Sequence, residues 1–159
     1  MGRRSLVLLV TLLAVGLALV PAAGALIVPK HSIAGASLRD TRAEIKAALG
    51  QPLRIIHGTN EFGPFTRFHY YRLNVLFLGS SGGAISIDTT RRREKTDRGI
   101  GVTSTTRELK DAYPSVDCQR VGFHSRLCVL GVPQVGRRVT VFRIHDGIIT
   151  RVEVEFVVD

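Results

Sequence analysis

The stretch best suited to contacting another molecule is "FTRFHYYR", residues 65–72. Its aromatic residues are typical of a β-strand, in which successive side chains point to opposite faces. One face would carry Phe65, Arg67, His69 and Tyr71. Because Tyr and Arg often anchor protein interfaces, we predict a binding face made of Arg67, His69, Tyr71 and Arg72. The alternative is sheet core with an ordinary edge.

The most basic stretch is "TRRREKTDRG", residues 90–99, which contains no apolar side chain. Its Arg91, Arg92 and Arg93 predict a contact site for an anionic group, such as an envelope polymer or a lipid headgroup. The alternative is a solvated connector between two halves of the chain. Together with residues 65–72, this stretch supplies the candidate binding residues.

The histidines do not form a catalytic or metal-binding motif. They are His31, His57, His69, His124 and His145. No two of them have the spacing of a metal-ligand pair on a helix or a strand. We therefore predict no metal site. A hydrolase of unknown class that depends on His69 or His124 is the minor alternative to a protein without catalytic activity.

Paired carboxylates are few. Glu153 and Glu155 alternate on a strand face that we expect to point toward solvent, where Arg143 or Arg151 can pair with them. Nothing in the sequence indicates the burial that would raise the pKa of a carboxyl group for acid–base catalysis. We predict surface ion pairs here, no catalytic residues in the chain and no cofactor.

The two cysteines, Cys118 and Cys128, are expected to form one disulfide that closes a short loop. The alternatives are a zinc site, for which His124 lies between the cysteines, and a reactive cysteine–histidine pair. A closed zinc site needs four ligands, and no further ligand lies nearby in the sequence. A disulfide also requires an oxidising compartment.

The N-terminus predicts export. A basic start is followed by the apolar stretch "SLVLLVTLLAVGLALV" and by small residues around Ala23-Gly24-Ala25. This order is typical of a cleaved signal peptide over residues 1–25, and an uncleaved membrane anchor is the alternative. Both place the folded part outside the cytoplasm, in the extracellular space or the cell envelope.

The formal net charge of +9 favours acidic partners. Because the chain is predicted to be exported, we expect another exported or envelope protein, or an anionic polymer or membrane surface, rather than nucleic acid. The alternative is that the positive charge only keeps the protein soluble.

Two short helices are expected to position these residues. Thr41 and Glu44 form a capping box at the start of one, and Thr105 and Glu108 do the same 64 positions later. Strand patterns and turn signals follow each helix. The sequence therefore predicts an α+β fold, in which two tandem helix-plus-antiparallel-strand repeats form a two-layer sheet with helices on one face. The predicted segments are a linker at 26–34, repeat 1 at 35–89, a basic connector at 90–98 and repeat 2 at 99–159.

The repeat also resembles a known design. The matching positions are Gly35, Thr41, Glu44, Gly50 and Gly83 in one half, and Gly99, Thr105, Glu108, Pro114 and Gly147 in the other. Over roughly residues 33–158 this pattern resembles the secreted β-lactamase-inhibitor proteins and the small outer-membrane assembly lipoproteins. In the inhibitor proteins each unit carries a disulfide after its helix, whereas here only the second unit has cysteines.

The resemblance implies a non-catalytic secreted or envelope protein that binds another protein. Two departures separate the chain from those families. It has three Tyr, seven Phe and no Trp, so the aromatic binding face of the inhibitors would be thin. It also lacks the N-terminal cysteine that carries the lipid of the lipoproteins. We therefore expect an inhibitor-like or assembly-like binding module, and a binder of anionic polymer or lipid as the alternative.

Overall fold

The computed structural model describes residues 26–79 and 82–158. The predicted signal peptide or anchor, residues 1–25, lies outside this part of the chain. Within the described residues, no helix has both the length and the apolar character needed to cross a membrane.

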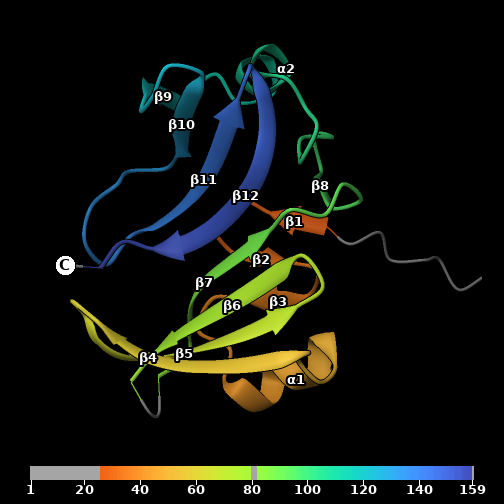
Figure 1. Ribbon diagram of the computed structural model, residues 1–159. Helices are drawn as coiled ribbons and strands as arrows, with labels where there is room; N and C mark the ends of the chain where they lie inside the picture. The colour runs from red at the N-terminus through yellow and green to blue at the C-terminus, as the bar shows by residue number, and fades with distance from the viewer. Residues whose placement is uncertain (1–25, 80–81, 159) are drawn as a thin grey trace, which may run out of the picture.

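The described part of the protein is built mainly from β-strands, arranged in two sheets (Figure 1). The large sheet is antiparallel and contains, in spatial order, β4 (Arg54–Asn60), β5 (Gly63–Tyr70), β6 (Leu73–Leu78), β7 (Ala84–Thr89), β12 (Ile148–Phe156), β11 (Arg138–His145), β10 (Ser125–Leu130) and β9 (Asp117–Arg120). The small sheet has the order β3 (Ala36–Ser37), β2 (Ser32–Ile33), β1 (Leu26–Val28) and β8 (Lys95–Thr96).

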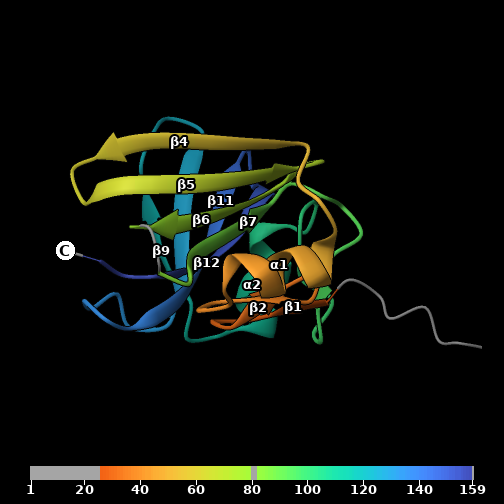
Figure 2. The ribbon, with the colours of Figure 1, turned by 90° about the horizontal axis from the view of Figure 1, so that it is seen from below.

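The predicted α+β class, with helices covering one face of a two-layer sheet, is wrong. The helices α1 (Arg42–Leu49) and α2 (Thr106–Ala112) have 8 and 7 residues, and each buries a single side chain, Ile45 or Leu109. Helices of this length extend only about 10–12 Å, too little to cover an eight-stranded sheet. Figure 1 shows α1 and α2 at opposite ends of the molecule with the small sheet between them, and in Figure 2 the short strands β1 and β2 lie below the large sheet, so short strands supply much of the second layer.

Both helix starts follow the sequence prediction. The Thr41 backbone N–H donates to Glu44 Oε2 at 2.8 Å, and the Thr41 hydroxyl accepts from the Glu44 backbone N–H at 3.3 Å. Thr105 and Glu108 make the same two bonds at 2.6 and 3.1 Å. These reciprocal bonds satisfy backbone donors that a helix N-terminus otherwise leaves unpaired.

The segments expected to be a linker and a connector contribute to the fold. Residues 26–34 contain β1 and β2, and Ile27 and Ile33 are fully buried. Residues 90–98 contain β8, which pairs in parallel with β1. The small sheet therefore joins residues that precede the first helix to residues that lie between the two meanders.

The two meanders of the large sheet join through their last strands. Strands β4 to β7 follow α1, strands β9 to β12 follow α2, and β7 pairs with β12 in antiparallel register. Asp88 lies opposite Glu153, with the pairs Thr89–Val152 and Ile87–Val154 on either side. Asp88 and Glu153 are 65 positions apart. A shift of 65 positions also takes Ile87 to Val152 and Thr89 to Val154, so each flanking pair maps onto the other. An approximate two-fold axis therefore passes between Asp88 and Glu153.

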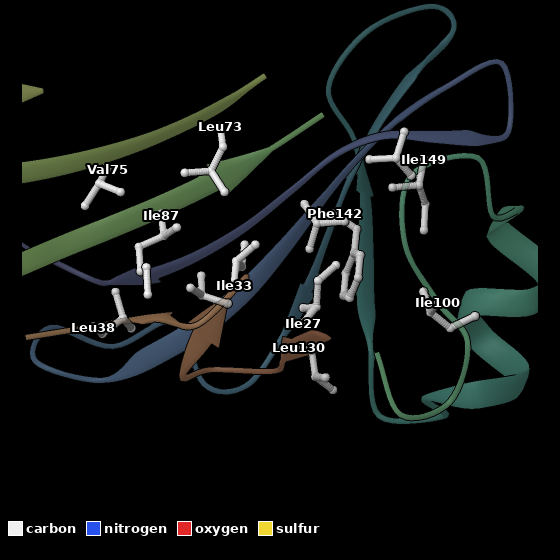
Figure 3. Packing of buried hydrophobic residues seen from close by; sticks show 14 of the residues in the cluster. Ile27, Ile33, Leu38, Leu73, Val75, Ile87, Ile100, Leu130, Phe142 and Ile149 are labelled. Atoms are coloured by element: carbon white, nitrogen blue, oxygen red, sulfur yellow. The ribbon is translucent and has the colours of Figure 1, made fainter. Parts of the chain in front are cut away.

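One hydrophobic core connects all of these elements. It includes Phe77 and Phe142 from the two meanders and Ile27 and Ile33 from the small sheet. Figure 3 shows the small-sheet isoleucines directed toward the large sheet, where Ile87 and Phe142 lie. Because each meander alone would leave this surface exposed, the two halves fold around a shared interior.

Candidate functional site

The first part of the candidate site is the turn between β5 and β6, which carries Tyr71 and Arg72. Arg72 lies in the left-handed region of this turn, at a φ of 55°. Tyr71 is 70% exposed. The turn therefore presents a phenol ring and a guanidinium to solvent.

The second part is the segment that follows β7. The Thr90 backbone N–H donates to the Arg72 carbonyl at 3.0 Å, and Arg91 Nε donates to the Tyr71 carbonyl at 2.6 Å. These bonds fasten the arginine segment to the β5–β6 turn. The hairpin of β6 and β7 thus brings together two stretches that are 20 positions apart in sequence.

A buried carboxylate holds the arginine segment in place. Glu94 is fully buried, and its carboxylate accepts from Arg91 Nη1 at 3.3 Å and from Arg93 Nε at 3.4 Å. The Thr89 hydroxyl donates to its other oxygen at 3.0 Å. Residues 90–99 contain no apolar side chain, yet Glu94 and Thr96 are buried. The hydrogen bonds of Glu94 make burial of its charge tolerable.

Five of the seven predicted binding residues line one cavity of about 460 Å³: Tyr71, Arg72, Arg91, Arg92 and Arg93. We call this cavity the arginine pocket. Within the residues that the structure describes, no carboxylate lies within 4.0 Å of Arg72 or Arg92. The pocket therefore has guanidinium groups free to bind an oxyanion, for which planar bidentate geometry is well suited.

The other two predicted residues, Arg67 and His69, lie elsewhere. They are exposed on the face of β5 opposite the core, whereas Phe68 and Tyr70 are buried. His69 Nδ1 lies 2.7 Å from Asn74 Oδ1, so this histidine belongs to a network on the open face of the sheet. The predicted alternation along β5 is confirmed. The four residues of the predicted binding face are divided, because Arg67 and His69 lie on the open face of the sheet and Tyr71 and Arg72 lie at the arginine pocket.

The open-face network centres on carboxylates near the two-fold axis. The Glu153 side chain is 15% exposed, accepts from the Ser86 hydroxyl at 2.6 Å, and pairs with Arg143 at 3.7 Å. Asp88 accepts two bonds from the Asn74 amide at 3.1 Å each. Burial raises the pKa of Asp88, although Arg151 and Asn74 oppose this effect.

Glu155 is more buried than we expected from the sequence, which placed it with Glu153 on a face that points toward solvent. Burial first, and the neighbouring Glu153 second, raise the pKa of Glu155 to about 7, while Arg143 acts in the opposite direction. The expected pairing of Arg143 with a strand carboxylate is present, but Arg151 contacts Asp88 at 3.6 Å. The sequence could not reveal this environment, because β7 pairs with β12 across a long separation.

The predicted disulfide between Cys118 and Cys128 is present. The two cysteines face each other directly on β9 and β10, with their Cα atoms 4.0 Å apart. The bond ties the four-residue edge strand β9 to the rest of the sheet. A disulfide fits an extracellular or envelope location, because the cytoplasm keeps most thiols reduced.

Comparison with known proteins identifies no family. No protein-family model matches the chain, and no curated protein sequence matches it. The fold is similar to the crystal structure of YjgB, a DUF4309 family protein from Bacillus subtilis subsp. subtilis strain 168. The identity is 19% and the TM-score 0.51, over 78% of this chain and 84% of that chain. This likeness concerns the fold alone.

A second similar structure is an extracellular protein containing an SCP domain from Bacillus anthracis strain Ames. Its identity is 9% and its TM-score 0.48, over 75% of this chain and 44% of that chain. This chain therefore matches less than half the length of that protein. Neither structure is described as a β-lactamase inhibitor or an assembly lipoprotein, so that resemblance stays a prediction from the sequence.

Proposed function

We propose that the protein is a non-catalytic binding module of the cell exterior or envelope, and that its arginine pocket binds an acidic segment of a partner protein. The observation that carries this proposal is the convergence of Tyr71 and four arginines around one cavity of about 460 Å³. The residues that line the pocket offer guanidinium donors and one phenol, a set suited to binding rather than to nucleophilic chemistry.

The electrostatics of the pocket support an anionic guest. The buried Glu94 pairs with Arg91 and with the exposed Arg93, and it holds these two arginines in position. Arg72 and Arg92 stay exposed at the rim. A carboxylate that enters the pocket would meet guanidinium groups that are already positioned, which lowers the entropic cost of binding.

The shape of the pocket favours a protein over a highly charged polymer. Its walls consist of the Tyr71 ring and the carbon stems of the arginines, and such stems cover considerable apolar surface. A peptide segment that has both apolar and acidic side chains complements walls of this kind. Anionic envelope polymer or lipid headgroups would complement the arginine charges but not the apolar walls. They are the alternative ligands that the experiment must distinguish from an acidic peptide.

The proposed location rests on two features. The N-terminal sequence is typical of a signal peptide, and the Cys118–Cys128 disulfide suits an oxidising compartment. If residues 1–25 are not cleaved, the module is anchored to the membrane with its pocket outside the cytoplasm.

The experiment compares three probes by fluorescence anisotropy or vesicle sedimentation with the purified protein. They are a labelled synthetic peptide that alternates Asp or Glu with Phe or Leu, poly(glycerol phosphate), and vesicles that contain phosphatidylglycerol. We expect the peptide to bind most tightly, and Arg92→Glu to weaken its binding at least about tenfold. The matched control is Arg107→Glu on α2, which makes the same charge change at an exposed site outside the pocket.

The alternatives give different results. An equal loss with Arg92→Glu and Arg107→Glu would show that only net charge matters. Tighter binding of the polymer or the vesicles would support the anionic-surface alternative. Salt adds a second criterion, because at about 0.5 M the Debye length falls to a few ångströms. Peptide binding should weaken there but persist, since the Tyr71 ring contributes an apolar contact.

A further inference from the structure

A second cavity, of about 320 Å³, lies at the end of the second meander, where three segments meet. These are the start of α2 at Thr106, the β9–β10 loop around His124 and the β11–β12 turn at Asp146 and Gly147. The Thr106 backbone N–H donates to the Gly147 carbonyl at 2.8 Å, and the Asp146 backbone N–H donates to the His124 carbonyl at 2.9 Å. The walls of this cavity are therefore tied together by backbone hydrogen bonds.

The corresponding place in the first meander is occupied by a side chain. Arg42, which lies 64 positions before Thr106, donates to the carbonyl of Gly79 at 2.8 Å and to that of Gly82 at 3.2 Å. Its guanidinium also lies 4.8 Å from the centre of the Phe77 ring. Thr106 reaches only the Gly147 carbonyl, at 3.1 Å. At matching positions, a long side chain therefore bridges helix and turn in the first meander, whereas a short one does so in the second.

The cavity carries an unneutralised pair of positive charges. Arg120 on β9 and Arg126 on β10 lie directly opposite each other, and both are exposed. In the part of the chain that the structure describes, neither has a carboxylate within 4.0 Å. Like charges that face each other across two strands destabilise a sheet. A bound anion would remove this repulsion.

Asp146 is the only carboxylate among the described residues that line the cavity, and it is already engaged. Asp146 Oδ1 lies 2.6 Å from His124 Nδ1, and Asp146 Oδ2 lies 3.4 Å from His145 Nε2. Ser125 Oγ lies 3.3 Å from His145 Nδ1. Because two imidazoles hold Asp146, the two arginines keep their charge available to a ligand.

An aromatic ring stands at the rim of the cavity. Phe123 is 90% exposed and contacts the His124 ring edge-to-face, with 4.4 Å between the ring centres. Exposure of a large aromatic side chain leaves a flat apolar surface in contact with water. A ligand with a ring can cover this surface while its anionic group reaches the arginines.

We propose that this second cavity binds a phosphomonoester carried on a ring, with the phosphate between Arg120 and Arg126 and the ring on Phe123. The phosphate dianion matches the two guanidinium charges and offers several acceptor oxygens. The volume suits a small molecule of this kind. The site is separate from the arginine pocket, so the two proposals can succeed or fail independently.

The test uses 4-nitrophenyl phosphate, followed by backbone amide NMR and by calorimetry at low salt. We expect saturable shifts in the amides of Phe123 and Arg126, with a dissociation constant on the order of 1 mM. Arg126→Gln should weaken binding about tenfold. Phe123→Ala should weaken it about threefold, and it serves as the second variant because its exposed side chain contributes little to folding. Inorganic phosphate and 4-nitrophenyl sulfate should both bind more weakly than the ester.

Two control variants define the site. Arg107→Gln removes one exposed positive charge from α2, and Arg92→Glu alters the arginine pocket; neither should change binding by more than about twofold. The proposal is overturned if the ester causes no saturable shift, or if Arg126→Gln binds it like the unmodified protein. Equal binding of the sulfate ester would contradict a dianion site, and equal binding of inorganic phosphate would contradict the role of Phe123.

Discussion

Asp88 and Glu153 face each other across the central strand pair of the large sheet, and each occupies the place of the other in the two meanders. Two carboxylates therefore meet where the halves of the protein join. Asn74 and Arg151 contact Asp88, and Ser86 and Arg143 contact Glu153. The junction is thus a polar network on one face of the sheet and hydrophobic core on the other.

The raised pKa of Glu155 predicts how stability depends on pH. The pKa of Glu155 is about 7 in the folded protein and 4.5 in the unfolded chain. Between these two pH values the folded protein keeps a proton that the unfolded chain has released. The folded state therefore binds more protons in this range, so this residue lowers the free energy of unfolding as the pH rises. Glu155→Gln should stabilise the protein at pH 8 by about 1 kcal/mol, a figure reduced for partial exposure, and should have little effect near pH 4.5.

Urea denaturation at the two pH values measures this difference. Glu61→Gln is the matched control, because Glu61 is exposed at the β4–β5 turn. It should alter stability by less than about 0.5 kcal/mol at either pH. Destabilisation by Glu155→Gln at pH 8 would contradict this prediction. It would show that the charged form of Glu155, together with Asp88 and Glu153, stabilises the fold.

Glu94→Gln should destabilise the protein by about 3 kcal/mol, because it leaves the Arg91 charge without its partner. The Arg91 side chain is 16% exposed, so water can compensate only in part. The same variant should weaken acidic-peptide binding, since Arg91 and Arg93 lose the group that positions them. Urea denaturation and anisotropy measure the two effects. Unchanged stability would show that Glu94 does not hold the arginine segment.

Removal of the Cys118–Cys128 bond should cost about 2–3 kcal/mol, as expected for a cross-link with a sequence separation of 10. We expect local loosening of β9, because it is a short edge strand and pairs only with β10 in the large sheet. Urea denaturation of the double Ala variant measures the cost. Amide hydrogen exchange should accelerate in β9 and not in β5 or β6, and a uniform acceleration would contradict a local role.

Gly83→Ala should destabilise the protein by about 2–3 kcal/mol through overpacking. A Cβ atom at this position would lie 2.2 Å from the Arg39 carbonyl oxygen and 2.8 Å from its Cα, so the backbone itself would have to move. Gly122→Ala is the control, because the nearest atom to its Cβ would be Ser125 Cβ at 3.5 Å. Similar denaturation midpoints for the two variants would contradict close packing at Gly83.

Local signals in the sequence predicted the local structure well. The capping boxes at Thr41 and Thr105 depend on residues three positions apart, so the pattern contains all the partners. The alternation along β5 is equally local. Gly83 and Gly147 hold matching sequence positions for different physical reasons. Gly147 has a φ of 77°, whereas Gly83 lies against the Arg39 backbone.

Features that depend on distant pairing could not be predicted. Strands β1, β2 and β8 have two or three residues each, too few to show periodicity, so their segments read as linkers. The α+β prediction failed for the same reason, because it assigned the second layer to helices. Residues of the arginine pocket were identified from their types, but the turn that joins Tyr71 to Arg91 is visible only in the fold. The second cavity is lined by segments that are distant in sequence, from Thr106 to Gly147, and only the fold brings them together.

The pairing of β7 with β12 gives one chain the form of a symmetric dimer. A single meander with its helix would leave its last strand as an open edge, ready to pair with another copy. Two copies joined in this way about a two-fold axis would form a symmetric homodimer. The protein has this arrangement within one chain, with residues 90–98 between the two halves. A single chain makes the association of the halves independent of concentration, and it allows the halves to differ, as the cavity at the end of the second meander illustrates.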